Sequence, residues 1–110
     1  MFQINNGKLI IKKKRNIDFI DLSKVLFIER FNNKTYIQVA DKNEIVVNVP
    51  LKDLEGVLPP NFKRSHRSFI VNKEYLEGLK LLNEKTYEAN FPNDKQALVL
   101  KQHVEYFLRS

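Results

Sequence analysis

The chain has 110 residues, enough for one hydrophobic core, and we expect a single domain spanning residues 1–110. It contains no cysteine, which excludes a disulfide scaffold, a thiol nucleophile and cysteine-ligated zinc or iron–sulfur sites. Its longest apolar runs, Val25–Ile28 and Ala97–Leu100, are too short for a membrane span or a signal peptide. We therefore expect a soluble, cytoplasmic protein.

The net charge is +6, from 19 lysines and arginines against 13 acids, and the cations are unevenly distributed. Five cations precede the first acid, Asp18, and residues 61–73 hold four more cations and no acid. Net charge informs about partners rather than about fold. Local clusters of cations in a small basic domain indicate an anionic partner, and nucleic acid is one candidate.

Alternating apolar and polar residues predict short β-strands through the first half of the chain. Asn32-Asn33 and residues 41–43 are turn signals, and Ser23 is expected to cap a single helical turn. The predicted strands cover residues 8–14, 17–22, 25–31, 34–40 and 44–49. In the fourth of these, Thr35 shares a face with Ile37 and Val39.

The periodicity changes after Pro50. Apolar residues three to four apart over 51–58 predict one short helix, which Pro59-Pro60 ends. Asn72 is expected to cap one helical turn, and residues 103–108 have helical spacing. Further strands are predicted over residues 69–71, 78–82, 85–91 and 96–100. The predicted fold class is mainly β, with about ten short strands in small antiparallel sheets and one or two short helices.

The sequence offers little for catalysis. Adjacent Ser65 and His66 on a strand would point to opposite faces, which is poor geometry for a nucleophile and its base. His66 and His103 do not form a motif with metal-ligand spacing, and no glycine-rich phosphate loop is present. We expect no enzyme activity, no catalytic residue, no metal and no cofactor.

The basic stretch Asn61–Ser68 is the strongest candidate for a binding site. It brings guanidinium, ammonium, hydroxyl and imidazole groups into one short span, and these groups suit phosphate oxygens and guanine edges. An ordinary solvated loop explains the stretch equally well on spacing alone. We interpret the separate cluster Lys12–Arg15 as a charged strand edge that discourages aggregation, with contact to nucleic acid as the alternative.

Residues Phe62–Asn72, with His-Arg-Ser ahead of an apolar strand ending in Val-Asn, resemble the hallmark of the LytTR DNA-binding domain family. Residues Ile20–Glu29 resemble the opening of that family's domain, and residues 51–59 resemble its single helix. The resemblance runs from about Ile17 to Leu108. It implies a mostly β domain that binds double-stranded DNA through loops in successive major grooves, bends the duplex and recognises repeated half-sites in promoters.

The resemblance also implies which residues contact DNA. They come from the loop after the Glu-bearing strand, from the hallmark and from the segment after the last strand. The expected contacts are Asn33, Lys34, Thr35, Lys63, Arg64, Arg67, Ser68, Lys101 and Gln102. His66 is expected to be structural. The family's Ser-Arg pair in the third segment is absent here, so that contact departs from the pattern.

Members of this family usually carry a receiver domain of a two-component response regulator or membrane segments ahead of the DNA-binding domain. Residues 1–16 are too short for either, so we expect a stand-alone member or an excised domain without a receiver. The implied partners are promoter DNA, a second copy on DNA, and a membrane-bound inhibitor or an upstream receiver domain in the full-length protein. The alternative function is a basic protein-interaction module without sequence-specific DNA binding.

Overall fold

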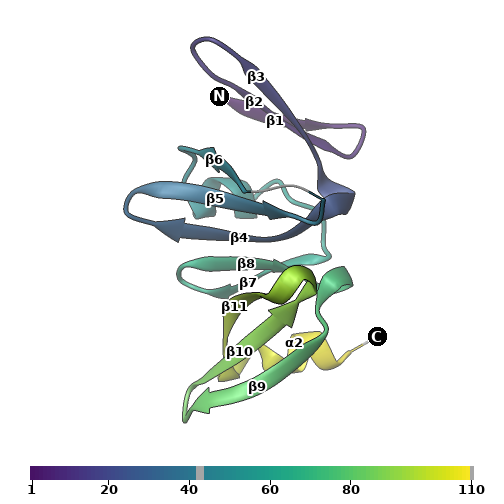
Figure 1. The fold of residues 1–110 in the computed structure, drawn as a ribbon, viewed down its shortest axis with the longest axis vertical. Helices are drawn as coiled ribbons and strands as arrows, with labels where there is room; N and C mark the ends of the chain where they lie inside the picture. The colour runs from purple at the N-terminus through teal and green to yellow at the C-terminus, as the bar shows by residue number, and fades with distance from the viewer. Residues whose placement is uncertain (42–43, 110) are drawn as a thin grey trace.

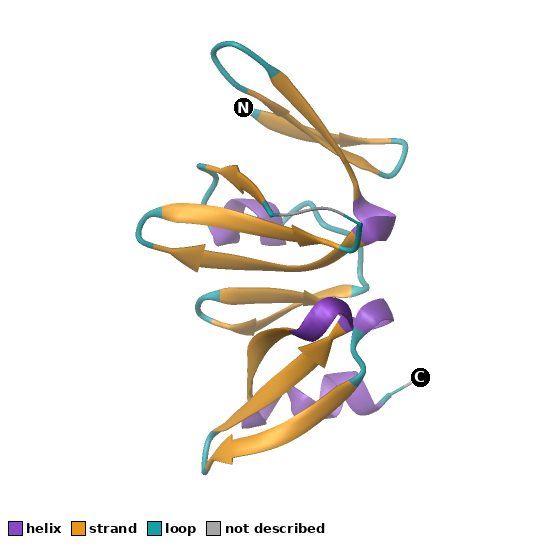
Figure 2. Ribbon diagram, viewed as in Figure 1, coloured by secondary structure: helices purple, strands orange, loops and turns teal. Residues whose placement is uncertain are grey.

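The described residues form three small antiparallel sheets, which are stacked along the long axis of the molecule (Figures 1 and 2). This computed structural model describes residues 1–41 and 44–109. The molecule measures 44 × 29 × 26 Å. Because each outer sheet covers one face of the central sheet, the domain has three layers and two separate cores.

The N-terminal sheet has the order β1-β2-β3 and consists of β1 (Phe2–Asn5), β2 (Lys8–Lys12) and β3 (Ile17–Asp21). The central sheet has the order β6-β5-β4-β8-β7 and consists of β6 (Ile45–Val47), β5 (Lys34–Val39), β4 (Val25–Phe31), β8 (Phe69–Asn72) and β7 (Phe62–His66). The C-terminal sheet has the order β11-β10-β9 and consists of β11 (Lys95–Leu100), β10 (Thr86–Phe91) and β9 (Gly78–Asn83).

The helices are short. In the part of the chain that the structure describes, two are α-helices, α1 (Leu51–Glu55) and α2 (Val104–Leu108). The 3-10 turns η1 (Leu22–Lys24), η2 (Lys73–Tyr75) and η3 (Pro92–Asp94) join successive strands, and η4 (Lys101–His103) leads from β11 into α2. Within residues 1–41 and 44–109, no helix has the length and apolar character needed to cross a membrane.

The apolar run Val25–Ile28 is buried throughout because β4 lies in the middle of the central sheet, with a core on each face. A register shift between Val25 and Phe27 breaks the strict alternation of the strand. Val25 and Ile28 therefore face the first core, whereas Leu26 and Phe27 face the second.

The first core lies between the N-terminal and central sheets and includes α1; its most deeply buried members include Leu9, Ile20, Ile28, Ile37 and Leu54. The second core lies between the central and C-terminal sheets and includes Phe107 of α2; it also contains Leu26, Phe27, Phe91 and Val99. Phe27 packs against Phe91 with their ring centroids 4.9 Å apart. Burial of these side chains supplies the main favourable free energy of folding.

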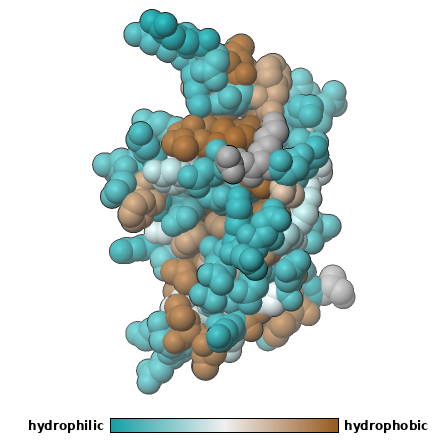
Figure 3. Space-filling view, in the orientation of Figure 1, coloured by the Kyte–Doolittle hydropathy of each residue, from teal (hydrophilic) through white to brown (hydrophobic). Residues whose placement is uncertain are grey.

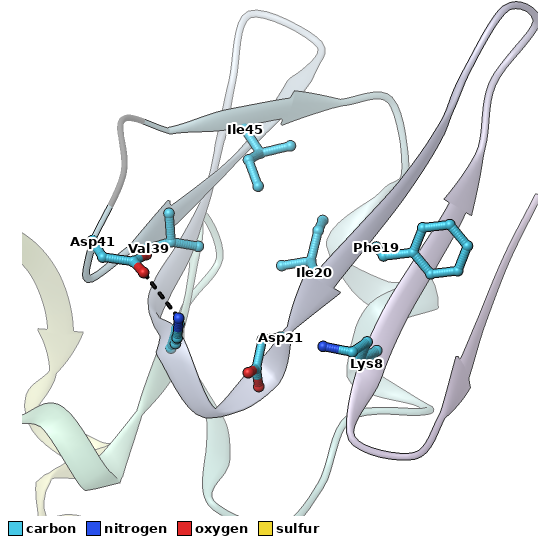
Figure 4. Close-up of a pocket in the computed structure, with 8 residues that line it drawn as sticks. Lys8, Phe19, Ile20, Asp21, Val39, Asp41 and Ile45 are labelled. Carbon is cyan, nitrogen blue, oxygen red and sulfur yellow. Dashed lines mark hydrogen bonds and ion pairs between the residues drawn. The ribbon is translucent and has the colours of Figure 1, made fainter.

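Figure 4 shows where β3 meets the central sheet. Ile20 points toward Val39 and Ile45, whereas Phe19 points away from them. A hollow of about 190 Å³ remains at this seam, and the ion pair between Lys24 and Asp41 (2.9 Å) lies beside it. The inner face of β3 thus joins the first core, and its outer face leaves Phe19 exposed.

Most of the predicted elements are confirmed, including the mainly β fold, the turn at Asn32-Asn33 and the strand Val25–Phe31 with its exact bounds. The Asn72 cap is confirmed as well, since its side chain accepts a hydrogen bond from the Glu74 amide at 3.0 Å. Residues 42 and 43 of the predicted turn at 41–43 lie outside the described residues.

Two local predictions are wrong, and two strands were not predicted. Asp21, not Ser23, caps η1, because the Asp21 carboxylate accepts the Ser23 amide hydrogen bond at 3.0 Å. The helix α1 ends at Glu55 rather than near Leu58. Strands β1 and β7 were not predicted; β7 is a strand in which Phe62 and Ser65 are buried between polar neighbours, and a register shift precedes His66.

Candidate nucleic-acid interface

Several turns that carry polar and basic residues lie along one side of the molecule. In Figure 1 the β4–β5 turn, the β7–β8 turn and the β9–β10 turn all lie at the left, arranged along the long axis. The segment η4, which follows β11, is bonded to the β9–β10 turn, because the Lys101 amide donates to the Lys85 carbonyl at 2.8 Å. The three predicted contact segments therefore map to this side.

The β4–β5 turn consists of Asn32 and Asn33, both in the left-handed region with φ values of 50° and 62°. A two-residue hairpin with two positive φ angles is a type I′ turn, and asparagine tolerates that conformation. Both asparagine side chains are exposed, and Lys34 is exposed at the start of β5. The turn therefore presents two amides and an ammonium to solvent.

Thr35 does not share this exposure. Its side chain is 0% exposed, its hydroxyl donates to the Val49 carbonyl at 2.6 Å, and its oxygen accepts a hydrogen bond from the Arg30 guanidinium at 2.9 Å. The strand alternation that groups Thr35 with Ile37 and Val39 explains this inward orientation. In this structure Thr35 supports the turn from inside, so we leave it out of the proposed DNA contacts.

The β7–β8 turn is held from within by Arg64. The guanidinium donates to the backbone carbonyls of His66 (3.0 Å) and Arg67 (2.7 Å) and to the Glu55 carboxylate (2.8 Å). Three of the five N–H donors of Arg64 are therefore bonded to acceptors within the protein. Arg67, by contrast, is exposed at the tip of the turn, and Ser68 is half-buried beside it.

His66 closes the same turn, as expected for a structural residue. Its Nδ1 accepts a hydrogen bond from the Ser68 amide at 3.0 Å, and its ring packs edge-on against Phe69. Burial, followed by the charges of Arg67 and Arg64, lowers the pKa of His66 below its ordinary value. A lowered pKa favours the neutral imidazole, the form in which Nδ1 can accept this bond.

The first two turns are bonded to each other. The Arg30 amide near the end of β4 donates to the Ser68 carbonyl at 2.9 Å, and the Arg30 guanidinium reaches Thr35. This connection fixes the position of the β7–β8 turn relative to the β4–β5 turn. The structure thus puts the turn that carries Asn33 and Lys34 next to the turn that carries Arg67 and Ser68, although the two turns are far apart in sequence.

The third segment, η4, exposes Lys101 and Gln102. The backbone bond to Lys85 places a further exposed cation next to Lys101, and the sequence reasoning missed Lys85 because it lies in an ordinary polar turn. Lys63 points toward α2 instead of the β7–β8 turn: its ammonium lies 5.3 Å from the centroid of the Tyr106 ring. Such a cation–π contact orients Lys63 within the protein.

Ser65 and His66 have separate partners. The Ser65 hydroxyl is buried and donates to the Leu98 carbonyl of β11 at 2.8 Å, which ties the central sheet to the C-terminal sheet. His66 bonds the Ser68 amide. In the described part of the chain, no three His, Asp or Glu side chains are grouped to hold a metal ion.

The stacked antiparallel sheets expose amide and cationic side chains on adjacent turns, and such groups suit the base edges and phosphates of nucleic acid. The sequence profile of the LytTr DNA-binding domain matches residues 15–109, and the chain belongs to this family. The family is one of DNA-binding domains and not a class of enzymes.

Two relatives illustrate the match. The transcriptional regulatory protein NatR of Bacillus subtilis (strain 168) is 33% identical over 104 residues, which are 93% of this chain and 44% of NatR. The chain therefore spans less than half the length of that relative. A solved LytTr DNA-binding domain from Bacillus cereus superposes with a TM-score of 0.77 at 25% identity, covering 94% of each chain.

Proposed function

We propose that this domain binds promoter DNA sequence-specifically, with the β4–β5 turn, the β7–β8 turn and η4 entering successive major grooves. The observation that carries the proposal is the arrangement of these segments along one side of a molecule 44 Å long. One helical turn of B-DNA advances about 34–36 Å. The long axis of the molecule is thus comparable in length with one helical turn, which suits turns arranged along it for successive grooves on one face of the duplex.

The exposed groups suit this role. The amide of Asn33 or Gln102 can pair with an adenine edge, and the cations of Lys34 and Arg67 suit guanine. Ser68 and Lys101 are suited to phosphate oxygens, which position a protein without reading sequence. Arg64, with three protein partners, acts by shaping the turn that presents Arg67.

A relative supports the proposed biological setting. NatR is a transcriptional regulatory protein and extends well beyond the region shared with this chain. We therefore propose a transcription regulator in the cytoplasm that recognises repeated half-sites, with two copies on the DNA. Control by a receiver domain or by a membrane-bound inhibitor belongs to the same proposal.

The first test is selection from a random duplex library at moderate salt, followed by sequencing. Enrichment of a short motif repeated about one helical turn apart is the expected result and identifies the operator. Retention of duplex without enrichment would contradict sequence reading. No retention by the folded protein would instead favour a basic protein-interaction module.

The second test is Arg67→Ala, with Lys8→Ala as a matched control because Lys8 lies at the far end of β2 from the contact side. If Arg67 pairs with a base, operator binding weakens by about 1–3 kcal/mol and binding to random duplex changes less. Equal losses on both duplexes would make Arg67 a phosphate contact.

With about six phosphates contacted, the logarithm of affinity falls against the logarithm of salt with a slope near −5.

A further inference from the structure

A second basic feature lies beside the proposed interface: the tip of the β2–β3 hairpin, residues 12–16, which we call the hairpin tip. It contains the exposed cations Lys12, Lys14 and Arg15. The interpretation of this cluster as a protective strand edge is wrong, because β2 is the inner strand of its sheet. Lys12 ends that inner strand, and Lys14 and Arg15 lie in the turn.

The hairpin tip is fixed to the central sheet. The Lys13 ammonium donates to the Val46 carbonyl of β6 at 3.0 Å and lies 2.7 Å from the Asp18 carboxylate. The Lys13 amide also donates to the Asn16 carbonyl at 2.8 Å, which closes the turn. The side chain of Lys13 therefore attaches the hairpin tip to the central sheet, and its bonds fix the position of the neighbouring cations.

This attachment places the hairpin tip next to the β4–β5 turn. Lys13, Asn33 and Lys34 line a single hollow of about 360 Å³, whose remaining walls come from residues 46–48. Figure 1 shows the β2–β3 turn on the same side of the molecule as the β4–β5 and β7–β8 turns, at the upper end. The space-filling view shows this projecting end as hydrophilic (Figure 3).

The exposed cations Lys12, Lys14 and Arg15 are available to bind an anionic ligand. Among residues 1–41 and 44–109, the side-chain ion pairs within 4.0 Å involve Lys13, Lys24 and Arg64, and not Lys12, Lys14 or Arg15. Cations on a turn beside a groove-reading segment are suited to the phosphates of the adjoining backbone. Lys12 and Lys14 carry compact charges on flexible stems, and the planar fork of Arg15 matches a phosphate, so all three suit neutralisation of the DNA backbone.

We propose that the hairpin tip is a fourth DNA contact, which binds backbone phosphates just beyond the base pairs met by the β4–β5 turn. The proposal rests on the proposed function, since it places the duplex against the same side. The family profile matches residues 15–109, so β1, β2 and Lys14 precede the region that it matches, and Arg15 lies at its first position.

The test compares two lengths of duplex: the selected operator alone and the operator extended by about ten base pairs on one flank or the other. The variant is Lys14→Ala/Arg15→Ala in the 110-residue chain. The matched control is Lys8→Ala/Lys80→Ala, which removes the same charge from exposed positions on the far end of β2 and on the outer strand β9. Circular dichroism checks that both variants remain folded.

Extension on one flank is expected to strengthen binding by the wild type and the control, and this gain disappears in the variant. Losing two phosphate contacts also makes the variant's salt slope on the extended duplex shallower by about 1.8. Over a fourfold rise in salt, the wild type then loses about twelvefold more affinity than the variant does.

Equal gains from extension in the variant and the control would overturn the hairpin contact while leaving operator recognition intact. Failure of the wild type to distinguish the short operator from random duplex would instead overturn the proposed function. In that case the hairpin contact is judged on random duplex alone, where a variant as tight and as salt-dependent as the control would refute it.

Discussion

Replacing Arg64 by alanine distinguishes two roles for this residue: direct contact with DNA and support of the turn that contacts DNA. The family resemblance places Arg64 among the DNA contacts, whereas the structure gives its guanidinium three protein partners around the β7–β8 turn. Its side chain is 26% exposed, less than that of its partner Glu55 at 49%. We predict that Arg64→Ala weakens operator binding through the turn and not through lost phosphate contact.

The expected loss of stability in Arg64→Ala follows from the three interactions that the guanidinium makes. The ion pair with Glu55 is largely exposed, so it contributes about 0–1 kcal/mol. Each hydrogen bond to the carbonyls of His66 and Arg67 contributes about 1 kcal/mol. We therefore expect the free energy of unfolding to fall by about 2 kcal/mol, which lowers Tm by about 8 °C in a domain of this size.

The effect on binding comes from the turn. Without Arg64, the carbonyls of His66 and Arg67 lose the guanidinium, while His66 keeps its bond to the Ser68 amide and its pairing with Phe69. Ordering a freed residue again on binding costs about 1–2 kcal/mol, so operator affinity should fall about five- to thirtyfold at a temperature where the variant is folded. Arg64→Lys keeps the charge but lacks the planar fork that reaches several acceptors, and it should behave like the alanine variant.

The assay is fluorescence anisotropy of labelled operator and random duplexes over a range of salt, with Arg67→Ala measured alongside. If Arg64 positions the turn, the salt slope of Arg64→Ala equals that of the wild type, and Arg64→Lys shows a similar loss. A slope shallower by about 0.9, with affinity rescued by lysine, would refute the reasoning and make Arg64 a phosphate contact.

Three further changes test other parts of the structure. Asn72→Ala should lower the free energy of unfolding by about 2–4 kcal/mol in urea titrations, because the side chain is 1% exposed and donates to the Val25 carbonyl at 2.8 Å; a loss under about 1 kcal/mol would contradict this role. His66 has a lowered pKa, so the unfolded chain binds the extra proton more readily. The contribution of His66 to the free energy of unfolding should therefore be present above the ordinary histidine pKa and lost as pH falls through the lower pKa of the folded protein. NMR titration measures that folded pKa, and His66→Gln should lack this part of the pH dependence. Thr35→Val should cost about 1–3 kcal/mol of stability by leaving the Val49 carbonyl without its partner, while the base preference found by selection stays unchanged.

Local sequence signals were enough where short-range chemistry decides the structure. Asn32-Asn33 forms the expected turn because asparagine tolerates positive φ, and Asn72 caps η2 through a bond two residues away. The strand Val25–Phe31 was recognisable from its composition. Its burial on both faces, however, depends on sheets that come from distant parts of the chain.

Two strands were missed, the polar β7 and the short β1. In β7 most side chains are charged or polar, and its strand character comes from pairing with β8 and from the bond between Ser65 and Leu98. The short strand β1 exists because β2 pairs with it and because Phe2 and Ile4 pack against the first core. Pairing and packing of this kind are tertiary effects that override weak local preference.

The sequence by itself determined the family, the mainly β fold and the basic and amide character of the candidate contact turns, since these depend on residue types and their order. Only the tertiary structure decided how each side chain is used. Thr35 bonds Val49 fourteen residues away, Arg64 bonds Glu55 nine residues away, and Lys13 bonds Val46 thirty-three residues away. A polar side chain binds whichever partner the fold brings within reach, and that partner is set by the packing of the three sheets.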